Sequence, residues 1–325
     1  MIVGICRTKN NQAIVEPFVR HHLRLLDRLL VCDNGSVDAT KQILKQLAVE
    51  DDRLVVSHDD GFGDFQTQHY DVLLHATEHY RPDYVVPLDC DEFLGVCDHE
   101  VLERILWRVP QGGNGVVCWR TFVITPDTVA ACEQDPPAGF AWRRRDELPE
   151  ICKVIIRTEG RSVREFSLGP GNHCTAGRSV NLRDGLPLLH FPIVSKQQML
   201  AKTVVHWMAF LVRDAEARNS GDDAWQTVRN FDHMMAADGE ITDEQLCEMS
   251  LMYAQDLYHE GKRPELVQDD HGIKYERRYS TGESMDVLPL LAKAWEQSMA
   301  SWKPYKNPVA LPQQLSDVWR ARFHL

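Results

Sequence analysis

The first 94 residues alternate between short apolar runs and longer segments with helical spacing, and this alternation restricts the possible folds more than any other feature of the chain. Four apolar runs bounded by polar residues predict buried strands, at residues 2–6, 28–32, 54–57 and 84–88. Three amphipathic segments between them predict helices, at about residues 16–26, 38–47 and 66–79. Strands and helices in this order form a parallel sheet covered by helices, so we predict an α/β fold.

The pattern changes after about residue 98. The elements predicted beyond this point are a helix at 101–109 and strands at 115–122, 152–157 and 188–191. Residues 126–149 are rich in Pro, Asp, Glu and Arg and predict a long, partly ordered loop. From residue 195 to about 301 the spacing is helical, apart from a predicted loop at 261–275. The proline-containing segment after residue 303 predicts an extended tail.

The chain of 325 residues is acidic, with a formal net charge of −12 and a sequence pI of about 5.6. This charge argues against a nucleic-acid-binding surface, because nucleic acids bind to positive surfaces. An anionic substrate would therefore need a metal ion or local Arg and Lys side chains. No apolar run approaches the ~20 residues of a membrane-spanning helix, and MIVGICRTKNN becomes polar too early for a signal peptide. We expect a cytoplasmic protein without a transmembrane segment, and peripheral contact with a membrane stays open.

Nine cysteines are scattered along the chain without a CxxC pair. In a chain of this size, the pattern predicts reduced, buried thiols rather than a disulfide framework or a zinc site. Reduced thiols agree with the expected cytoplasmic location.

The fourth predicted strand ends on a cluster of three carboxylates. The stretch YVVPLDCDEFL runs from Tyr84 to Leu94 and places Asp89, Asp91 and Glu92 directly after the apolar run. Open α/β sheets bind ligands at the carboxyl ends of their strands, and buried like charges are costly unless a cation compensates them. This DxD-containing cluster therefore predicts a site for a divalent metal, Mn²⁺ or Mg²⁺. The alternative is an acidic turn that only ends a strand.

Several motifs occur in the order and spacing of a known family. Three of them follow predicted strands, namely CRTKNN, VCDNGSVDAT and LDCDEFL. Four more lie downstream, namely CWRTF, KVIIR, GNH and LLHFPIVSKQQMLAK. Together they make residues 1–202 resemble the family-two-like glycosyltransferases with a GT-A fold. A Gly-rich phosphate-binding loop is missing after the first strand, which weakens a dinucleotide or P-loop interpretation.

The resemblance implies a GT-A-type, mostly parallel sheet flanked by helices, with a helical C-terminal extension. Residues 1–110 would form the nucleotide-sugar-binding half, 111–194 the acceptor-side half of the same domain, and 195–325 a helical region with an extended tail. The implied enzyme is a metal-dependent, hexosyltransferase-like glycosyltransferase of polysaccharide biosynthesis. It would move a sugar from a nucleotide-diphosphate donor to a hydroxyl of a saccharide or glycan precursor, with inversion.

The same resemblance implies the metal ligands. Asp91 is expected to bind the metal directly. Asp89 is expected either to bind the metal as well or to face the ribose or a metal-bound water. His190, in LLHFP, is expected to complete the metal shell, and His173, in GPGNH, competes for that role. Glu92 has no assigned role. Both histidines have an alternative as core or edge residues.

Further residues are expected to hold the nucleotide sugar. Asp33 resembles the residue that recognises the base, and a carboxylate that accepts from a ring N–H favours uracil or thymine. The other expected contacts are Arg7, Thr8 and Asn10 beside the base and ribose, Gln68 near the nucleotide or sugar, and Lys202 at the diphosphate. Each of these residues has an alternative as a capping, surface or solvated helix residue.

An inverting transferase needs a carboxylate base within hydrogen-bond reach of the acceptor hydroxyl. The first candidates are Asp184 and Glu150, while Glu133, Asp135 and Glu147 stay open. Trp119, Trp142 and Trp207 are candidates for stacking on sugars or for the core.

Two other functional classes stay open. One is a nucleotidyltransferase or nucleotide-sugar pyrophosphatase with a similar metal site, and the missing Gly-rich loop argues against the nucleotidyltransferase. The other is a non-catalytic glycan- or nucleotide-binding protein. The energetic cost of retaining unpaired carboxylates argues against that class.

Overall fold

The computed structural model describes residues 1–59, 66–211, 230, 241–255, 261–280, 291–292 and 295–296. Its centre is a sheet whose first half is parallel. The strands of this half are β1 (Ile2–Thr8), β2 (Arg28–Asp33), β3 (Leu54–His58) and β4 (Tyr84–Asp89). The helices are α1 (Val15–Leu25), α2 (Thr40–Glu50) and α3 (Gln66–Ala76), and the 3-10 helix η1 (Thr77–Tyr80) follows α3.

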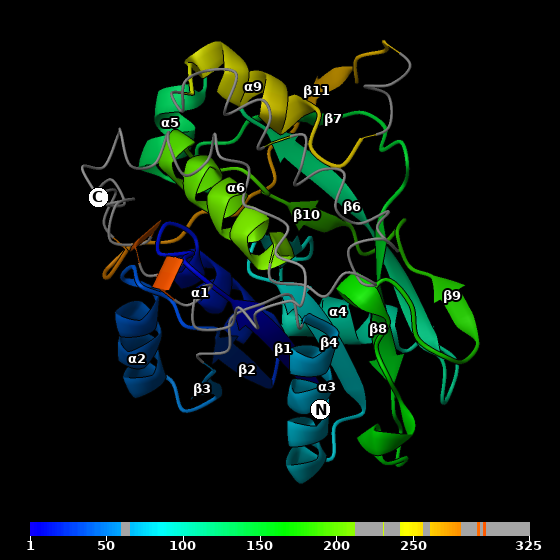
Figure 1. Cartoon of the computed structure of the whole chain (residues 1–325). Helices are drawn as coiled ribbons and strands as arrows, with labels where there is room; N and C mark the ends of the chain where they lie inside the picture. Colours follow the sequence, from blue (N-terminus) through cyan, green and yellow to red (C-terminus); the bar gives the residue numbers. More distant parts are fainter. Residues whose placement is uncertain are drawn as a thin grey trace, which may run out of the picture.

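The four parallel strands lie in the order β3-β2-β1-β4 (Figure 1). Because they are parallel, their carboxyl ends meet at one edge of the sheet. In the register of this edge, Thr8 pairs with Asp33 and Arg7 pairs with Asp89. Residues that are far apart in the sequence are therefore brought together where the strands end.

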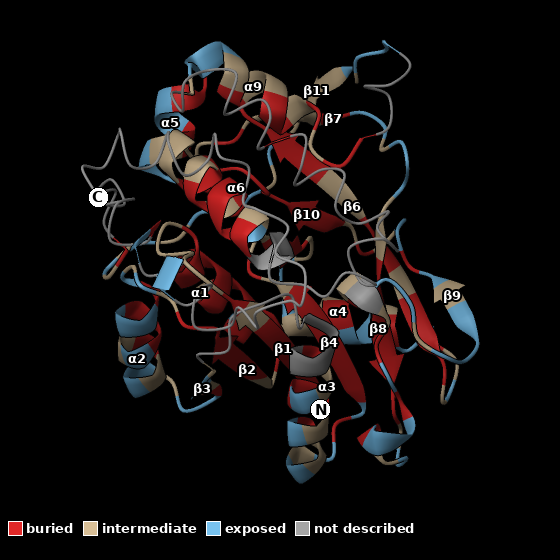
Figure 2. Ribbon diagram, in the orientation of Figure 1, coloured by how far each residue is buried: buried red, intermediate tan, exposed pale blue. Residues whose placement is uncertain are grey.

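Side chains of β1 alternate between two hydrophobic clusters. Ile2 and Cys6 pack in the larger cluster with α1 and α2, whereas Val3 and Ile5 pack in a second cluster with α3. β1, β2 and β4 are largely buried (Figure 2), whereas β3 at the edge of the sheet is partly exposed. Coverage on both faces explains why the predicted strands read as continuous apolar runs.

The second half of the sheet is mixed. Its strands are β5 (Glu92–Leu94), β6 (Asn114–Val123), β7 (Trp142–Arg144), β8 (Cys152–Arg157), β9 (Ser179–Asn181), β10 (Leu188–His190) and β11 (Leu266–Gln268). Its helices are α4 (His99–Leu106), α5 (Val129–Gln134), α6 (Lys196–Leu211) and α9 (Asp243–Leu251), with the 3-10 helices η2 (Val163–Glu165) and η3 (Pro170–Asn172). β8 lies antiparallel between β4 and β6, so the strand order is β11-β7-β6-β8-β4-β1-β2-β3.

Two segments that the sequence predicted as loops contain regular structure. Residues 126–149 include α5 and β7, and residues 261–275 include β11. β7 pairs antiparallel with both β6 and β11. Strands of three residues show no readable alternation, and their pairing depends on partners far along the chain. The loop predictions were therefore wrong at these positions.

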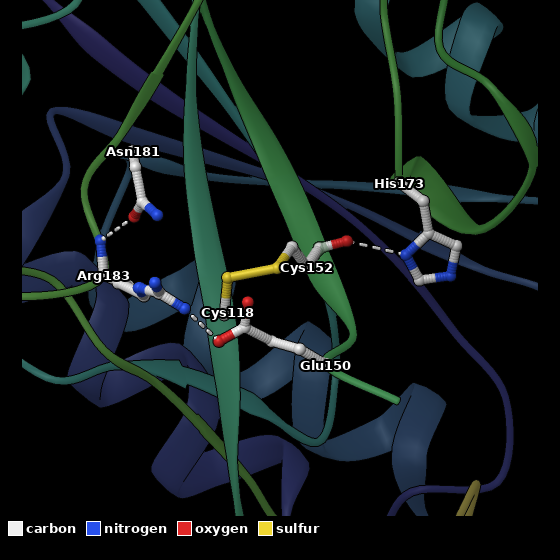
Figure 3. The surroundings of a disulfide bond; sticks show 6 residues. All are labelled: Cys118, Glu150, Cys152, His173, Asn181 and Arg183. Carbon is white, nitrogen blue, oxygen red and sulfur yellow. Dashed lines mark hydrogen bonds and ion pairs between the residues drawn. A yellow bond between two sulfur atoms is a disulfide. The ribbon is translucent and has the colours of Figure 1, made fainter. Parts of the chain in front are cut away.

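The prediction of reduced thiols is wrong for one pair of cysteines. Cys118 in β6 and Cys152 in β8 lie directly opposite each other and form a disulfide (Figure 3). The sequence pattern did not reveal it, because 34 residues separate the two cysteines. Cys97 and Cys174 are exposed rather than buried. Other free thiols are buried as predicted, at Cys6, Cys32, Cys90 and Cys132.

Most of the predicted C-terminal helical region, and the predicted tail after residue 303, lie outside the described residues. In the part that is described, α9 packs near α6, as Figure 1 shows. Residues 278–280 lie against α1, where the backbone N–H groups of Tyr279 and Ser280 donate to Glu16. Among the described residues, no helix combines the length and apolar character needed to cross a bilayer.

Candidate functional site

Two loops at the carboxyl edge of the parallel strands are joined by side-chain hydrogen bonds. Asn10 follows β1. Its Oδ1 accepts a hydrogen bond from the N–H of Val37 (3.0 Å), and its own N–H donates to Ser36 Oγ (2.9 Å). The φ of Asn10 is +54°, a left-handed conformation that Asn tolerates better than most residues. Asn11 N–H donates to Thr40 Oγ1 at the start of α2 (2.8 Å). These hydrogen bonds therefore hold the loop after β1 and the loop after β2 in a fixed position relative to each other.

Arg7 and Thr8 form the end of β1. In the sheet register, Arg7 lies beside Asp89 and Thr8 lies beside Asp33. The Arg7 guanidinium donates to Asn34 Oδ1, while burial lowers the pKa of the guanidinium from its ordinary value. Two of the residues expected beside the nucleotide thus lie next to two of the expected carboxylates.

Asp33 is buried at the end of β2. Its Oδ1 accepts from Ser36 N (3.3 Å), and its Oδ2 lies 3.4 Å from His58 Nδ1. None of the described residues donates a hydrogen bond of acceptable geometry to Oδ2. An unsatisfied buried acceptor is costly, and an N–H donor from a ligand would satisfy it. Gln68 lies on α3, but its side chain is outside the described part of the structure.

The ammonium group of Lys153 in β8 lies between Asp89 and Glu92. Its Nζ is 2.6 Å from Asp89 Oδ2 and 3.3 Å from Glu92 Oε1. Asp89 Oδ1 accepts from the Tyr70 hydroxyl (2.8 Å), and Glu92 Oε1 accepts from Trp119 Nε1 (2.7 Å). Glu92 Oε2 accepts from the Asp89 N–H (2.8 Å). Every carboxylate oxygen of this pair therefore has a protein donor.

The two carboxyl groups beside Lys153 differ in acidity. Burial opposes the charge of Asp89, but the ammonium of Lys153 outweighs this effect and holds the pKa of Asp89 below its ordinary value. Burial raises the pKa of Glu92 to about 8, because Lys153 compensates it only in part and the charges of Asp89 and Asp91 add to the effect. Asp89 is therefore the more acidic of the two carboxyl groups that face Lys153.

Asp91 is held differently from its two neighbours. Its Oδ2 lies 3.3 Å from Lys202 Nζ in α6, and the Lys202 ammonium also donates to Pro192 O (3.1 Å). The Asp91 carbonyl accepts from Phe191 N (2.8 Å), which fixes the acidic turn to the end of β10. The side chains of Asp91 and Lys202 keep 16% and 21% of their surface exposed, so this pair is open to a ligand.

His190 lies at the centre of three strands. It is paired with Glu92 in β5 and with Thr121 in β6. Its Nδ1 is 3.2 Å from Thr121 Oγ1, and its ring stacks on Trp119 with centroids 3.7 Å apart. Burial, aided by the positive charge of Lys202, lowers the pKa of His190 well below its ordinary value. The imidazole is therefore neutral, the form that binds metals.

In the described part of the chain, the expected ligands Asp89, Asp91 and His190 do not bring three ligand atoms close enough together to hold a metal ion by themselves. Among the described residues, the only three His, Cys, Asp or Glu residues whose ligand atoms cluster are Cys118, Glu150 and Cys152. The two sulfurs of that group are joined in the disulfide. At the acidic turn, Asp91 supplies a partly exposed carboxylate and His190 a neutral imidazole. Mg²⁺ and Mn²⁺ commonly use one or two carboxylates together with the phosphate oxygens of a substrate.

Glu150 lies on the disulfide side of the sheet. Its carboxylate is within 4.8 Å of the sulfurs of Cys118 and Cys152 and forms an ion pair with Arg183 (Figure 3). Successive side chains of a strand point to opposite faces, so Lys153, the residue after Cys152, points away from this group. Asp184, the other first candidate for the base, is exposed in the turn before β10. Neither residue contacts the acidic turn.

Unlike Glu150 and Asp184, Glu147 contacts a residue that touches His190, namely Thr121. Its Oε1 accepts from Thr121 N (2.7 Å), its Oε2 accepts from Gln255 Nε2 (3.1 Å), and Arg144 Nη1 lies 3.2 Å away. Burial raises its pKa above the ordinary value of a glutamate. The other two acids interact elsewhere, Glu133 with the N–H of Lys196 and Asp135 with Arg277.

The sequence analysis missed the role of Lys153. A lysine that opens an apolar strand, as in KVIIR, was a usable signal, because a buried lysine needs a negative partner. His173 lies exposed in the loop that Lys153 contacts, with its Nδ1 2.7 Å from Cys152 O. Of the three tryptophans, Trp119 touches the acidic turn, whereas Trp142 lies in β7 and Trp207 in α6.

Two comparisons with known proteins found matches. Residues 5–131 match the family described as glycosyl transferase family 2. This range contains Arg7, Asp33 and the whole acidic turn. The chain is also similar to the structure of a mannosyltransferase from Pyrobaculum calidifontis in complex with GDP-Man and Mn2+, with 14% identity over 91% of this chain and 86% of that chain and a TM-score of 0.37. No curated protein sequence matches the chain.

Proposed function

Residues 5–131 form a glycosyltransferase family 2 domain, which makes the chain a glycosyltransferase with a GT-A fold, and on this premise we propose its donor, cofactor and reaction. The proposed donor is a nucleotide-diphosphate sugar with a pyrimidine base, UDP above all. The acceptor is a hydroxyl of a saccharide or glycan precursor, and the sugar is transferred with inversion. The proposed cofactor is Mn²⁺ or Mg²⁺.

The observation that carries the proposal is the meeting of Asp33, Arg7 and the acidic turn at the carboxyl edge of three parallel strands. The unsatisfied Oδ2 of Asp33 supports recognition of a base by an N–H donor, which uracil and thymine present at N3. Asp89 ends β4, which lies two strands from β2 in the sheet, so we assign the ribose and the diphosphate to the acidic turn. Asn10 and Thr8 would contact the nucleotide beside its base and ribose.

The proposed metal ligands in the protein are Asp91 and His190. A bound divalent cation supplies Lewis-acid stabilisation of the negative charge that develops on the departing diphosphate. Asp89, whose side chain is 29% exposed, would face the ribose. Lys202 would form an ion pair with the diphosphate, because it lies beside Asp91 and is not fully buried.

The proposed base is Glu147. It is linked to His190 through Thr121, whose N–H donates to Glu147 and whose hydroxyl contacts the imidazole. Removing the acceptor proton calls for a carboxylate with a pKa raised toward the working pH, and burial moves Glu147 in that direction. Glu150 and Asp184 remain the alternatives from the sequence, but both are exposed and neither contacts the acidic turn.

The test is release of nucleotide from a panel of nucleotide sugars, with Mn²⁺, with Mg²⁺ and with chelator. We expect nucleoside diphosphate to appear only with metal and to disappear in Asp91→Asn. Asp52→Asn, an exposed acid before β3, serves as the matched control and should leave release unchanged. Release of nucleoside monophosphate would instead indicate a pyrophosphatase, and binding without release would indicate a non-catalytic protein.

A further inference from the structure

Lys153 is one of the most deeply buried charges among the described residues. Its side chain is 2% exposed. The two carboxylates that compensate its charge belong to a different segment of the chain. Its ammonium contacts Asp89, Glu92 and the carbonyl of Gly171, the last at 2.7 Å. An ammonium has three N–H donors, so these three acceptors occupy it completely.

The carboxylates on either side also accept hydrogen bonds from other donors. Asp89 is shared between Lys153 and Tyr70, and Glu92 is shared between Lys153, Trp119 and the Asp89 N–H. A metal ion that bound to these two residues would have to displace a buried ammonium. It would leave that ammonium without a counter-charge, and an uncompensated buried charge is strongly destabilising.

Lys202 offers the contrast. It lies 3.3 Å from Asp91 and is 21% exposed, whereas Lys153 lies 2.6 Å from Asp89. A longer ion pair in which both side chains keep some exposed surface is exchanged more easily than a fully buried one, because water reaches both partners. The acidic turn therefore combines one fixed cation with one exchangeable cation.

We propose that Lys153 is a positioning residue that acts as a built-in counter-cation, keeping Asp89 and Glu92 out of metal coordination. Asp91 is then the only carboxylate of the turn that is available to a metal ion. The free protein consequently holds divalent metal weakly, and firm binding requires the phosphate oxygens of the donor. This inference rests on the proposed metal dependence, but it concerns binding by the protein before any transfer.

The test removes the ammonium and measures metal binding without nucleotide. In Lys153→Ala, the space between Asp89 and Glu92 becomes available to a hydrated cation. We expect Mn²⁺ to bind about tenfold more tightly than to the unsubstituted protein in calorimetric titrations. The melting temperature of the variant should also rise with Mn²⁺. Lys196→Ala, which removes an ion pair with Asp243 at the surface, is the matched control and should not change Mn²⁺ binding.

A second substitution makes the result specific to this pair. Adding Glu92→Gln to Lys153→Ala removes one of the two acids, so the gained Mn²⁺ binding should be lost. If Lys153→Ala does not fold in metal-free buffer, Mn²⁺ should restore its folding. Unchanged Mn²⁺ affinity in the folded variant, or no rescue of an unfolded one, would overturn the proposal. Because nucleotide release is not measured, these outcomes do not depend on whether the chain transfers sugar from the proposed donor.

Discussion

The indole ring of Trp119 stacks on the imidazole of His190, with centroids 3.7 Å apart, and at the same time donates its Nε1 hydrogen to Glu92 at 2.7 Å. One side chain thereby fixes two neighbours, the buried histidine of β10 and the buried glutamate of β5. The stack holds the imidazole plane, while the hydrogen bond holds the carboxyl group against Lys153. Trp119 thus holds two buried side chains beside the acidic turn from its position in β6.

The two functions of Trp119 can be separated by substitution. Trp119→Phe keeps an aromatic ring beside His190 but leaves Glu92 without its indole donor, which should cost about 1–3 kcal/mol of folding stability. Trp119→Ala removes the ring as well and should cost about 3–5 kcal/mol. Urea denaturation of both variants measures these losses. Equal stability of Trp119→Phe and the unsubstituted protein would show that the Glu92 contact contributes little.

Asp33 gives a prediction about base selectivity. A carboxylate accepts from the N3–H of uracil, whereas an amide can present either a donor or an acceptor. Asp33→Asn should therefore weaken UDP binding by about tenfold or more, because a hydrogen bond to a charged acceptor contributes about 1.5–3 kcal/mol. Calorimetric titration with UDP and CDP gives the two affinities. CDP lacks this N–H, so its binding should change less, and an equal loss for both would contradict base recognition by Asp33.

The parallel half of the fold was predictable because its strands are buried on both faces and therefore appear as apolar runs. The polar residues where those runs end then mark the carboxyl edge, where Asp33 and Asp89 lie in the sheet register. The family and enzyme class predicted from the motifs are confirmed by the match over residues 5–131. The parts that needed only local sequence information were therefore accessible.

The remaining features depend on contacts between distant segments. β7 and β11 are too short to show a pattern, and they exist because each pairs with the other. The disulfide needs β6 and β8 to be adjacent, which no spacing of cysteines reveals. Lys153 and Trp119 acquire their roles only because β8 and β6 pass beside the acidic turn. The sequence could mark these residues as unusual in a strand, but it could not supply their partners.

Glu147 leads to a prediction about pH dependence. As the proposed base it must be deprotonated, so activity should fall when the pH drops through its pKa. Because burial raises that pKa, the acidic limb of kcat/KM should lie above the value of about 4.3 for an ordinary glutamate. Glu147→Gln should lower kcat about 100-fold or more while donor affinity is retained. Steady-state kinetics against pH measure both effects, and Glu150→Gln tests the competing assignment. If only Glu150→Gln causes a large loss of kcat, Glu150 rather than Glu147 is the base.

Glu16 in α1 gives the last prediction, which concerns stability against acid. Its buried carboxylate accepts the backbone N–H groups of Arg278 (3.0 Å), Tyr279 (2.9 Å) and Ser280 (2.7 Å), and it also pairs with Arg20. Burial alone would raise its pKa, but these hydrogen bonds outweigh burial and lower the pKa to about 2. The folded-state pKa therefore lies below the unfolded-state value of about 4.3.

A depressed pKa contributes stability that is fully present above the unfolded-state value and is lost as the pH falls toward the folded-state value. Glu16 should thus contribute about 3 kcal/mol at neutral pH, and this contribution should decline between about pH 5 and pH 2. Glu16→Gln should lower the free energy of unfolding at pH 7 and flatten its decline in that window, as measured by urea denaturation at several pH values. Glu276→Gln is the matched control, because Glu276 lies in the same segment with its side chain 82% exposed. If both variants follow the same pH profile as the unsubstituted protein, the Glu16 contacts do not hold residues 278–280 against α1.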